Sequence, residues 1–294
     1  MTSDNAVPAS GRPGIEVLRL AAFTEDGSGG NPAGVVLDAG SLTAADRLAV
    51  AADVGYSETA FVEPGAADGR HRVRYFSPQA EVRFCGHATV AAAVALAQRG
   101  SPGELLFDTL AGPVPVRTEA TATGYLATLT SAPTRTRPAT DTELSAAVQA
   151  LRWQVDDLDP RYPPHVAYAG NDHLVVAVTE RARLAELDYD YDALGALMAE
   201  RGWTTVHLVH AHSPVLFSAR NPFPPGGVVE DPATGAAAAA FGGYLRALGL
   251  VDLPAQVTVR QGQDMGRPSR LLVSLRADDD RVQVSGAAAL LTDR

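Results

Sequence analysis

The apolar pattern of the chain is strongest in two alanine-rich stretches. Between Ala88 and Ala97 only Thr89 interrupts the apolar residues, which predicts a helix that is apolar on every face and buried in a core. This run of ten residues is too short to span a bilayer, which takes about 18 apolar residues. A similar stretch covers Gly235 to Leu245. We therefore expect two buried helices, each wrapped by other elements.

The two predicted helices have similar surroundings. Glu81 precedes Gly86 at the start of the first helix, and Glu230 with Asp231 precedes Gly235 at the start of the second. The two glycines are 149 residues apart (235 − 86), about half of the 294 residues in the chain. A repeat of this length indicates a duplicated unit, so we predict two similar halves, each built around its own helix.

The rest of the pattern predicts a mixture of helices and strands. Thr43 and Asp46 form a capping-box pattern at the start of an amphipathic helix that Gly55 ends. Further helices are expected over residues 140–151 and 191–201. A glycine-rich loop over 24–34 should precede a short strand at 35–37. The remaining strands are predicted at 15–23, 70–76, 104–109, 113–118, 125–130, 165–169, 173–178, 206–210, 215–218, 256–261, 270–275 and 281–285.

This order favours a particular fold class and division into domains. Helices and strands do not alternate strictly, which favours an α+β architecture with mostly antiparallel strands. Residues 1–14 read as a disordered tail, residues 15–131 as an N-terminal domain and residues 132–285 as a C-terminal domain. The proline-rich segment 131–138 is the expected linker.

Composition excludes several classes of partner. The chain has 34 acidic and 24 basic residues, a formal net charge of −10, which argues against nucleic acid or an anionic membrane as a partner. The N-terminal residues lack the cationic and apolar regions of a signal peptide, so a cytoplasmic protein is expected. The single cysteine, Cys85, excludes an internal disulfide framework and a cysteine-built zinc site.

Several histidines raise the question of a metal site. His207, His210 and His212 lie close together in the chain, and His165 and His173 are on neighbouring predicted strands. On a strand only His210 and His212 share a face. Two imidazoles without a nearby carboxylate make a poor zinc site, so no metal is expected.

Three other residues form a more informative set. Glu58 stands at the beginning of a predicted strand, His87 in the first turn of the first alanine helix, and Asp231 just before the second. Each has an ordinary structural explanation by itself, as a solvated strand-end charge or a helix cap. The predicted duplication, however, places both helix starts at a cleft between the halves. Two carboxylates, an imidazole and two helix N-termini can hold an anion and move its protons without a cofactor.

With the blocks Cys85–Thr89 and Glu230–Gly235 around these residues, the sequence resembles the phenazine-biosynthesis isomerase (PhzF-like) family, which has the diaminopimelate-epimerase-like fold. The resemblance covers nearly the whole chain, in blocks that follow the order of the family. These blocks are Gly30–Val35, Ser57–Phe61, Phe76–Pro78 with Glu81–Val82, Cys85–Thr89, Glu230–Gly235, Gln261–Gly262 and Met265–Ser269.

The resemblance implies an architecture and roles for individual residues. It implies two pseudo-symmetric domains with the active site between them, a C-terminal segment (286–294) that returns to the first domain, and a homodimer. Glu58 would be the general acid/base, supported by His87 and Asp231. The substrate-binding residues would be Asn31, Gly86, Thr234, Gly235 and Ala236. Ala236 departs from the family, which often has serine there, and this puts the dihydro-hydroxyanthranilate substrate of phenazine biosynthesis in doubt.

We therefore predict a cofactor-independent isomerase that moves a proton between carbons of a small carboxylate-bearing metabolite. Two alternatives stay open: an epimerase of an amino-acid-like substrate, in which His87 or Asp231 acts opposite Glu58, and a family member that binds a metabolite without catalysis. Related racemases use two opposed thiols, which the single Cys85 cannot supply. Cys85 is therefore expected to be a bystander.

Overall fold

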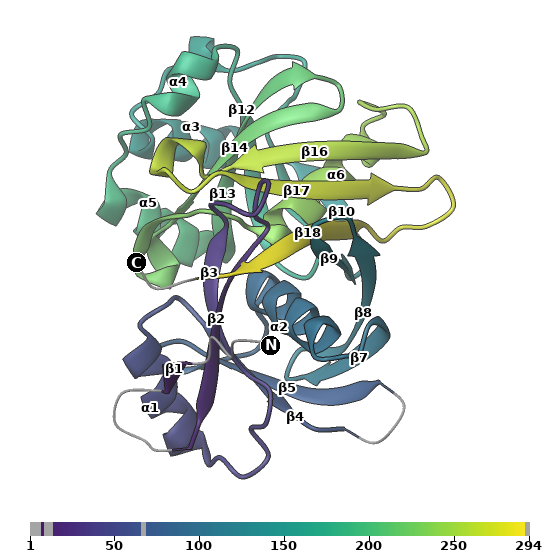
Figure 1. The fold of residues 1–294 in the computed structure, drawn as a ribbon. Coiled ribbons are helices and arrows are strands. Elements are labelled where there is room, and N and C mark those ends of the chain that lie inside the picture. Colours follow the sequence, from purple (N-terminus) through teal and green to yellow (C-terminus); the bar gives the residue numbers. More distant parts are fainter. Residues whose placement is uncertain (1–6, 9–13, 66–68, 292–294) are drawn as a thin grey trace. The chain divides into compact units, whose positions relative to one another are not determined.

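The computed structural model describes residues 7–8, 14–65 and 69–291, which divide into two compact units (Figure 1). Unit 1 is formed by residues 1–130 and 285–294, and unit 2 by residues 131–284. Most of the predicted disordered tail, residues 1–14, lies outside the described residues. Within it, Val7 and Pro8 pair with Val17 and Glu16 of the first long strand.

Unit 1 contains ten described strands and two helices. The helices are α1 (Ala44–Val54) and α2 (Gly86–Gln98). The strands are β1 (Val7–Pro8), β2 (Glu16–Ala22), β3 (Asn31–Val36), β4 (Thr59–Glu63), β5 (Arg70–Phe76), β6 (Glu81–Val82), β7 (Gly103–Thr109), β8 (Gly112–Thr121), β9 (Gly124–Thr130) and β18 (Gln283–Leu290), of which the residues from Ser285 belong to this unit.

The strands of unit 1 close around α2. The order of hydrogen-bonded neighbours is β2, β3, β4, β5, β7, β8, β9 and β18, and β18 pairs with β2 again. The pairs β3–β4 and β5–β7 are parallel, and the other printed registers in this unit are antiparallel. Every residue of α2 from His87 to Ala97 is buried, as the all-round apolar pattern predicts. The ring of strands thus covers the apolar side chains on all faces of α2.

Two local predictions in unit 1 can be compared with the structure. The Thr43–Asp46 capping box is confirmed: the hydroxyl and main-chain N–H groups of Thr43 donate to the Asp46 carboxylate, and Gly55 ends α1 in the left-handed conformation. The predicted loop over 24–34 was wrong at its end, because β3 already begins at Asn31. Pro32 has no N–H group to donate. It precedes the residues of β3 that pair with β4, so no hydrogen bond between those two strands is lost.

Unit 2 contains eight described strands and four α-helices. The helices are α3 (Asp141–Ala150), α4 (Arg181–Ala185), α5 (Tyr191–Arg201) and α6 (Gly235–Ala247). The strands are β10 (Arg135–Pro138), β11 (His165–Tyr168), β12 (Asp172–Ala177), β13 (Trp203–Ser213), β14 (Leu216–Phe223), β15 (Val228–Asp231), β16 (Ala255–Gln261) and β17 (Ser269–Leu275). The segment predicted as a linker, 131–138, therefore includes a strand.

The sheet of unit 2 has two packed faces. Strands β10, β11, β12, β13 and β17 contact α6, whose residues are buried from Ala237 to Leu245. A second apolar core, which includes Leu151, Leu194 and Met198, packs α3 and α5 against β12 and β13. The pairs β12–β13 and β14–β16 are parallel and the other printed pairs of this unit are antiparallel, so the coarse prediction of an α+β fold with a mixed, mostly antiparallel sheet is confirmed.

A glycine in α6 sets how closely the helix packs in unit 2. A Cβ added to Gly243 would lie 2.5 Å from Cβ and 2.6 Å from Oγ1 of Thr134. We expect Gly243→Ala to lower the free energy of unfolding by about 1–3 kcal/mol, because the overpacking at a rigid Cβ outweighs the gain of about 1 kcal/mol in helix propensity. Urea denaturation checks this, and a variant as stable as the parent would contradict it.

Among residues 7–8, 14–65 and 69–291, no helix has both the length and the apolar character that a bilayer crossing requires.

Candidate active site

The predicted site residues form two groups, one in each unit, and each group is described by itself. Unit 1 holds Asn31, Glu58, Gly86 and His87. Unit 2 holds Asp231, Thr234, Gly235 and Ala236.

Glu58 lies immediately before β4, at the N-terminal end of that strand. Its main-chain carbonyl accepts a hydrogen bond of 3.2 Å from the N–H group of Gly34 on β3. A Cβ at Gly34 would lie 2.6 Å from Oγ1 of Thr59, so glycine permits this close approach of the two strands. The Glu58 side chain is 17% exposed and its Oε2 lies 3.5 Å from Nε2 of His87. The carboxylate is thus partly shielded from water yet reachable.

His87 is the second residue of α2, directly after Gly86. Its side chain is 7% exposed, and Nε2 also lies 3.4 Å from Oγ of Ser57. One ring nitrogen therefore faces both the Glu58 carboxylate and the Ser57 hydroxyl. The N–H groups in the first turn of α2 have no acceptor within the helix and lie at the positive end of its dipole. The structure brings Glu58 and His87 together, and it adds Ser57, which the sequence had not indicated.

Cys85, which is expected to be a bystander, lies in the same cluster as Glu58 and His87. Its sulfur lies 3.3 Å from Nδ1 and 3.8 Å from Nε2 of His87, and the residue is 8% exposed. One ligand atom from each of Glu58, Cys85 and His87 fits within 4.8 Å of the others, which raises a metal site. The sulfur is nearly equidistant from the two ring nitrogens, so it lies beside the ring. A metal in the ring plane would not reach it without a turn of the imidazole.

Hydrogen bonds anchor the first turn of α2 to the barrel. The carbonyl of Cys85 accepts from the N–H group of Thr89 at 3.0 Å and from its hydroxyl at 2.6 Å. Because that hydroxyl proton is used, the Tyr75 hydroxyl donates to Thr89 Oγ1, over 2.6 Å. Burial raises the pKa of Tyr75, which keeps its proton in place. The position of His87 is therefore tied to β5.

In unit 2, Asp231 is the last residue of β15 and pairs with Asn221 of β14. The hydroxyl of Thr234 donates to Oδ2 of Asp231 over 2.6 Å. Helix α6 begins at the next residue, Gly235, and its first internal bond runs from the N–H group of Ala238 to the carbonyl of Thr234. The methyl group of Ala236 supplies no hydrogen-bonding atom. The structure thus gathers all four predicted residues of this unit at the start of α6.

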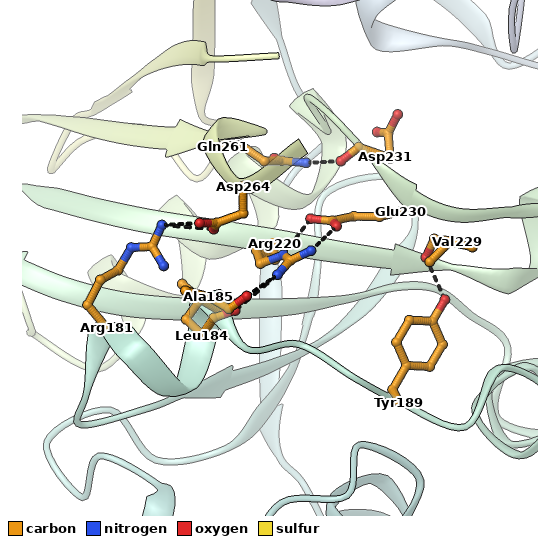
Figure 2. Close-up of polar contacts among 10 residues, drawn as sticks. All are labelled: Arg181, Leu184, Ala185, Tyr189, Arg220, Val229, Glu230, Asp231, Gln261 and Asp264. Atoms are coloured by element: carbon orange, nitrogen blue, oxygen red, sulfur yellow. Dashed lines mark hydrogen bonds and ion pairs between the residues drawn. The ribbon is translucent and has the colours of Figure 1, made fainter. Parts of the chain in front are cut away.

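The two neighbouring acidic residues of β15 have different environments. Glu230 makes a two-pronged ion pair with Arg220, with distances of 2.9 Å and 2.5 Å, and its side chain is 4% exposed (Figure 2). Arg220 also donates to the carbonyl of Ala185 at 2.8 Å. Glu230 therefore stabilises the strand that carries Asp231, whereas the carboxylate of Asp231 projects away from this ion pair.

The histidines considered for metal binding have another role. His173 is hydrogen-bonded to Thr205 at 2.8 Å, Thr205 donates to Oδ1 of Asn221 at 2.9 Å, and His207 is bonded to the same oxygen at 3.2 Å. Both histidines are fully buried in unit 2. Burial lowers the pKa of His173 to about 3 and that of His207 to about 4, so both rings are neutral near pH 7. These histidines form a buried polar network on β12, β13 and β14.

The sequence missed Ser57, the contact of Cys85 with His87, and Gln261, whose side chain binds the segment from Asp231 to Thr234. Ser57 and Cys85 adjoin the predicted Glu58 and Gly86, and Gln261 lies in one of the blocks of the resemblance. Their positions were thus visible in the sequence, but their side-chain contacts depend on the folded structure. Ser57 and His87 are 30 residues apart and Gln261 and Thr234 are 27 apart, whereas Cys85 and His87 are only two apart.

Comparison with known proteins identifies the family of this chain. The sequence matches the family described as "Phenazine biosynthesis-like protein" over residues 20–294. It is 35% identical over 295 residues to an uncharacterized isomerase from Deinococcus radiodurans, covering 95% of this chain and 93% of that protein. It is 30% identical over 269 residues to trans-2,3-dihydro-3-hydroxyanthranilate isomerase from Pseudomonas chlororaphis, covering 87% and 90% of the two chains.

A solved structure of a protein from the same family has a similar fold. A phenazine biosynthesis protein of the PhzF family from Bacillus anthracis superposes with a TM-score of 0.84 at 26% identity, covering 94% of this chain and 97% of that one. The family match covers more than nine-tenths of the sequence, and the relatives carry the name of isomerases. The chain therefore belongs to the phenazine biosynthesis-like (PhzF) protein family and is an isomerase.

Proposed function

We propose that this isomerase moves a proton between carbons of a small carboxylate-bearing metabolite by general acid/base catalysis, without a cofactor. The observation that carries the proposal is the Glu58 carboxylate, 17% exposed, with Oε2 held 3.5 Å from Nε2 of His87. A carboxylate in this setting can take a proton from an activated carbon and return it elsewhere, which typically contributes a rate factor of about 10²–10⁴.

The neighbouring groups receive supporting roles. His87 would stabilise the two protonation states of Glu58, because an imidazole nitrogen can donate or accept a hydrogen bond, and Ser57, bonded to the same ring nitrogen, would orient the imidazole. We assign Asp231 to the same reaction, as a group that binds substrate and assists proton transfer. Its hydrogen bond from Thr234 fixes the orientation of its carboxylate.

The substrate class follows from the helix starts. The N–H groups of the first turns of α2, from Gly86, and of α6, from Gly235, can bind a carboxylate. The P. chlororaphis relative makes trans-2,3-dihydro-3-hydroxyanthranilate the first candidate to test. Ala236 supplies no hydroxyl where many family members have one, which favours a different acid of the same class. Asn31, buried on β3, completes the proposed set of binding residues.

We also propose that the two units are copies of one ancestral unit. In support, α2 and α6 are both 13 residues long, both begin at a glycine, and each is buried against the strands of its own unit. The duplication would explain why chemically useful residues precede both helices.

The direct test is a screen for hydrogen exchange in heavy water. The enzyme is incubated with trans-2,3-dihydro-3-hydroxyanthranilate and with other small unsaturated or amino acids, and deuterium incorporation is followed by mass spectrometry and NMR. We expect exchange at one carbon or more for at least one acid of this class. The proposal would be contradicted if the enzyme bound acids of this set but incorporated deuterium into none of them.

Epimerisation of an amino-acid-like substrate is a second candidate, in which Glu58 would be one base and His87 or Asp231 would supply the proton from the opposite face of the carbon. The stereochemistry of the product separates the two candidates. An epimerase inverts one centre and leaves the double bonds in place, whereas the proposed isomerase relocates a double bond.

A further inference from the structure

Gln261, the last residue of β16, lies fully buried at the segment that carries Asp231. Its side-chain nitrogen Nε2 donates to the main-chain carbonyl of Asp231 at 2.6 Å and to Oγ1 of Thr234 at 3.0 Å. Its oxygen Oε1 accepts from the main-chain N–H group of Thr234 at 3.1 Å. Figure 2 shows the amide of Gln261 directed at the backbone of Asp231, with the Asp231 carboxylate on the far side.

The main chain decides which way round this amide lies. A backbone N–H group can only donate, so Thr234 needs the oxygen of Gln261 opposite it. A backbone carbonyl can only accept, so Asp231 needs the nitrogen. With both contacts satisfied, the second N–H bond of the amide is directed to the hydroxyl oxygen of Thr234.

This orientation has a consequence for Asp231. A hydroxyl has one proton to donate. Since Oγ1 of Thr234 accepts from Gln261, its own proton remains for Oδ2 of Asp231, at 2.6 Å. The direction of donation therefore runs from Gln261 to Thr234 and from Thr234 to the carboxylate. A hydrogen bond to a charged acceptor is stronger than one between neutral groups.

The residue after Gln261 holds this arrangement in place. Gly262 has a φ of +78°, and a Cβ there would lie 2.3 Å from the carbonyl oxygen of Arg267 and 2.8 Å from that of Pro232. The backbone that follows Gln261 is therefore packed against the same segment that its side chain binds. Glycine is required here both by the positive φ and by the lack of space.

We propose that Gln261 is a positioning residue that fixes the orientation of the Asp231 carboxylate through the hydroxyl of Thr234. The inference rests on the proposed role of Asp231 in the reaction and adds to it the group that controls the geometry of Asp231. Gln261 is not a catalytic residue, because it acts only through Thr234 and the backbone.

The test uses Gln261→Glu, which keeps the shape of the side chain and removes both N–H donors. The Thr234 hydroxyl then donates to the new carboxylate and is lost to Asp231. We expect kcat/KM for substrate exchange to fall about 10- to 100-fold, mostly in kcat, the range for losing a hydrogen bond to a charged group. The control is Gln256→Glu, the same change at an exposed position of the same strand, which should leave kinetics unchanged.

A double-mutant cycle separates positioning from simple structural support. In the Asp231→Asn background, Gln261→Glu should cost little further activity, because the group that it positions is already gone. Thr234→Val should reproduce the loss, and Thr234→Ser should lose less activity than Thr234→Val, because serine keeps the hydroxyl. Equal fold-losses from Gln261→Glu in both backgrounds, or an unchanged kcat in Thr234→Val, would overturn the proposal.

A failure of the proposed role of Gln261 can be distinguished from a failure of the proposed function. If Gln261→Glu does not fold, as judged by circular dichroism, the Thr234→Val and Thr234→Ser pair answers the question. If the wild-type enzyme shows no exchange with any substrate, the proposed function fails. The same double-mutant cycle is then measured as unfolding free energies in urea. Coupling between positions 261 and 231 in unfolding free energy would then support the hydrogen-bond relay, and strict additivity would overturn it.

Discussion

Replacement of Glu58 by glutamine is expected to lower the rate of substrate hydrogen exchange by about 10²–10⁴-fold, the range for loss of a general acid/base. The amide matches the carboxylate in shape and can still contact His87, whose Nε2 lies 3.5 Å from Oε2 of Glu58. It cannot, however, take up and release a proton near neutral pH. The loss should therefore appear in kcat, with a smaller change in KM.

The measurement is deuterium incorporation from heavy water under saturating substrate. A matched control is Glu104→Gln, the same change at an exposed position of β7 in the same unit, which should exchange at the wild-type rate. Unfolding in urea establishes that Glu58→Gln is folded. Wild-type exchange by a folded Glu58→Gln enzyme would remove Glu58 from the proposed mechanism.

Acidification from pH 7 to pH 5 is expected to lower the free energy of unfolding through the two buried histidines of unit 2. The folded-state pKa of His173 is lowered to about 3 and that of His207 to about 4, in each case mainly by burial, with a further contribution to His173 from the nearby His207. In the unfolded chain a histidine has a pKa of about 6.5.

The direction of the effect follows from proton uptake. Below a pH of about 6.5 the unfolded chain binds protons at both positions and the folded protein does not, so stability falls as the pH falls toward the folded-state values. At pH 5 each histidine contributes a loss of about 2 kcal/mol, together about 4 kcal/mol relative to high pH. This is a large part of the stability of a typical domain.

Comparison of variants assigns this loss to the network. His207→Asn keeps a side-chain N–H donor near the position of Nδ1 for Asn221 and removes one titrating group, so the difference in unfolding free energy between pH 7 and pH 5 should shrink by about 2 kcal/mol. The absolute stability at pH 7 can change without affecting this comparison. Urea denaturation at the two pH values makes the measurement, and an unchanged difference in the variant would show that other groups cause the acid sensitivity.

Much of the fold could be predicted from local pattern. The all-round apolar character of Ala88–Ala97 indicated a buried helix, and His87–Ala97 is buried in the structure. The capping box at Thr43 marked the start of α1. The spacing of Glu58, His87 and Asp231 near strand and helix ends identified the candidate site residues, and the structure shows the contact between the first two. Local sequence determines such features because propensity, capping and periodicity act over a few neighbouring residues.

Side-chain contacts were decided only by the tertiary structure. Nothing near Cys85 in the sequence shows that its sulfur lies 3.3 Å from the imidazole of His87. Glu230 and Asp231 look alike as an acidic pair, but only Glu230 pairs with Arg220. Gln261 lies 27 residues from Thr234, and its role depends on the parallel pairing of β16 with β14, which brings the two together. Hydrogen-bond direction and burial depend on which residues pack against one another. The order of residues along the chain does not give these neighbours, so only the tertiary structure decided them.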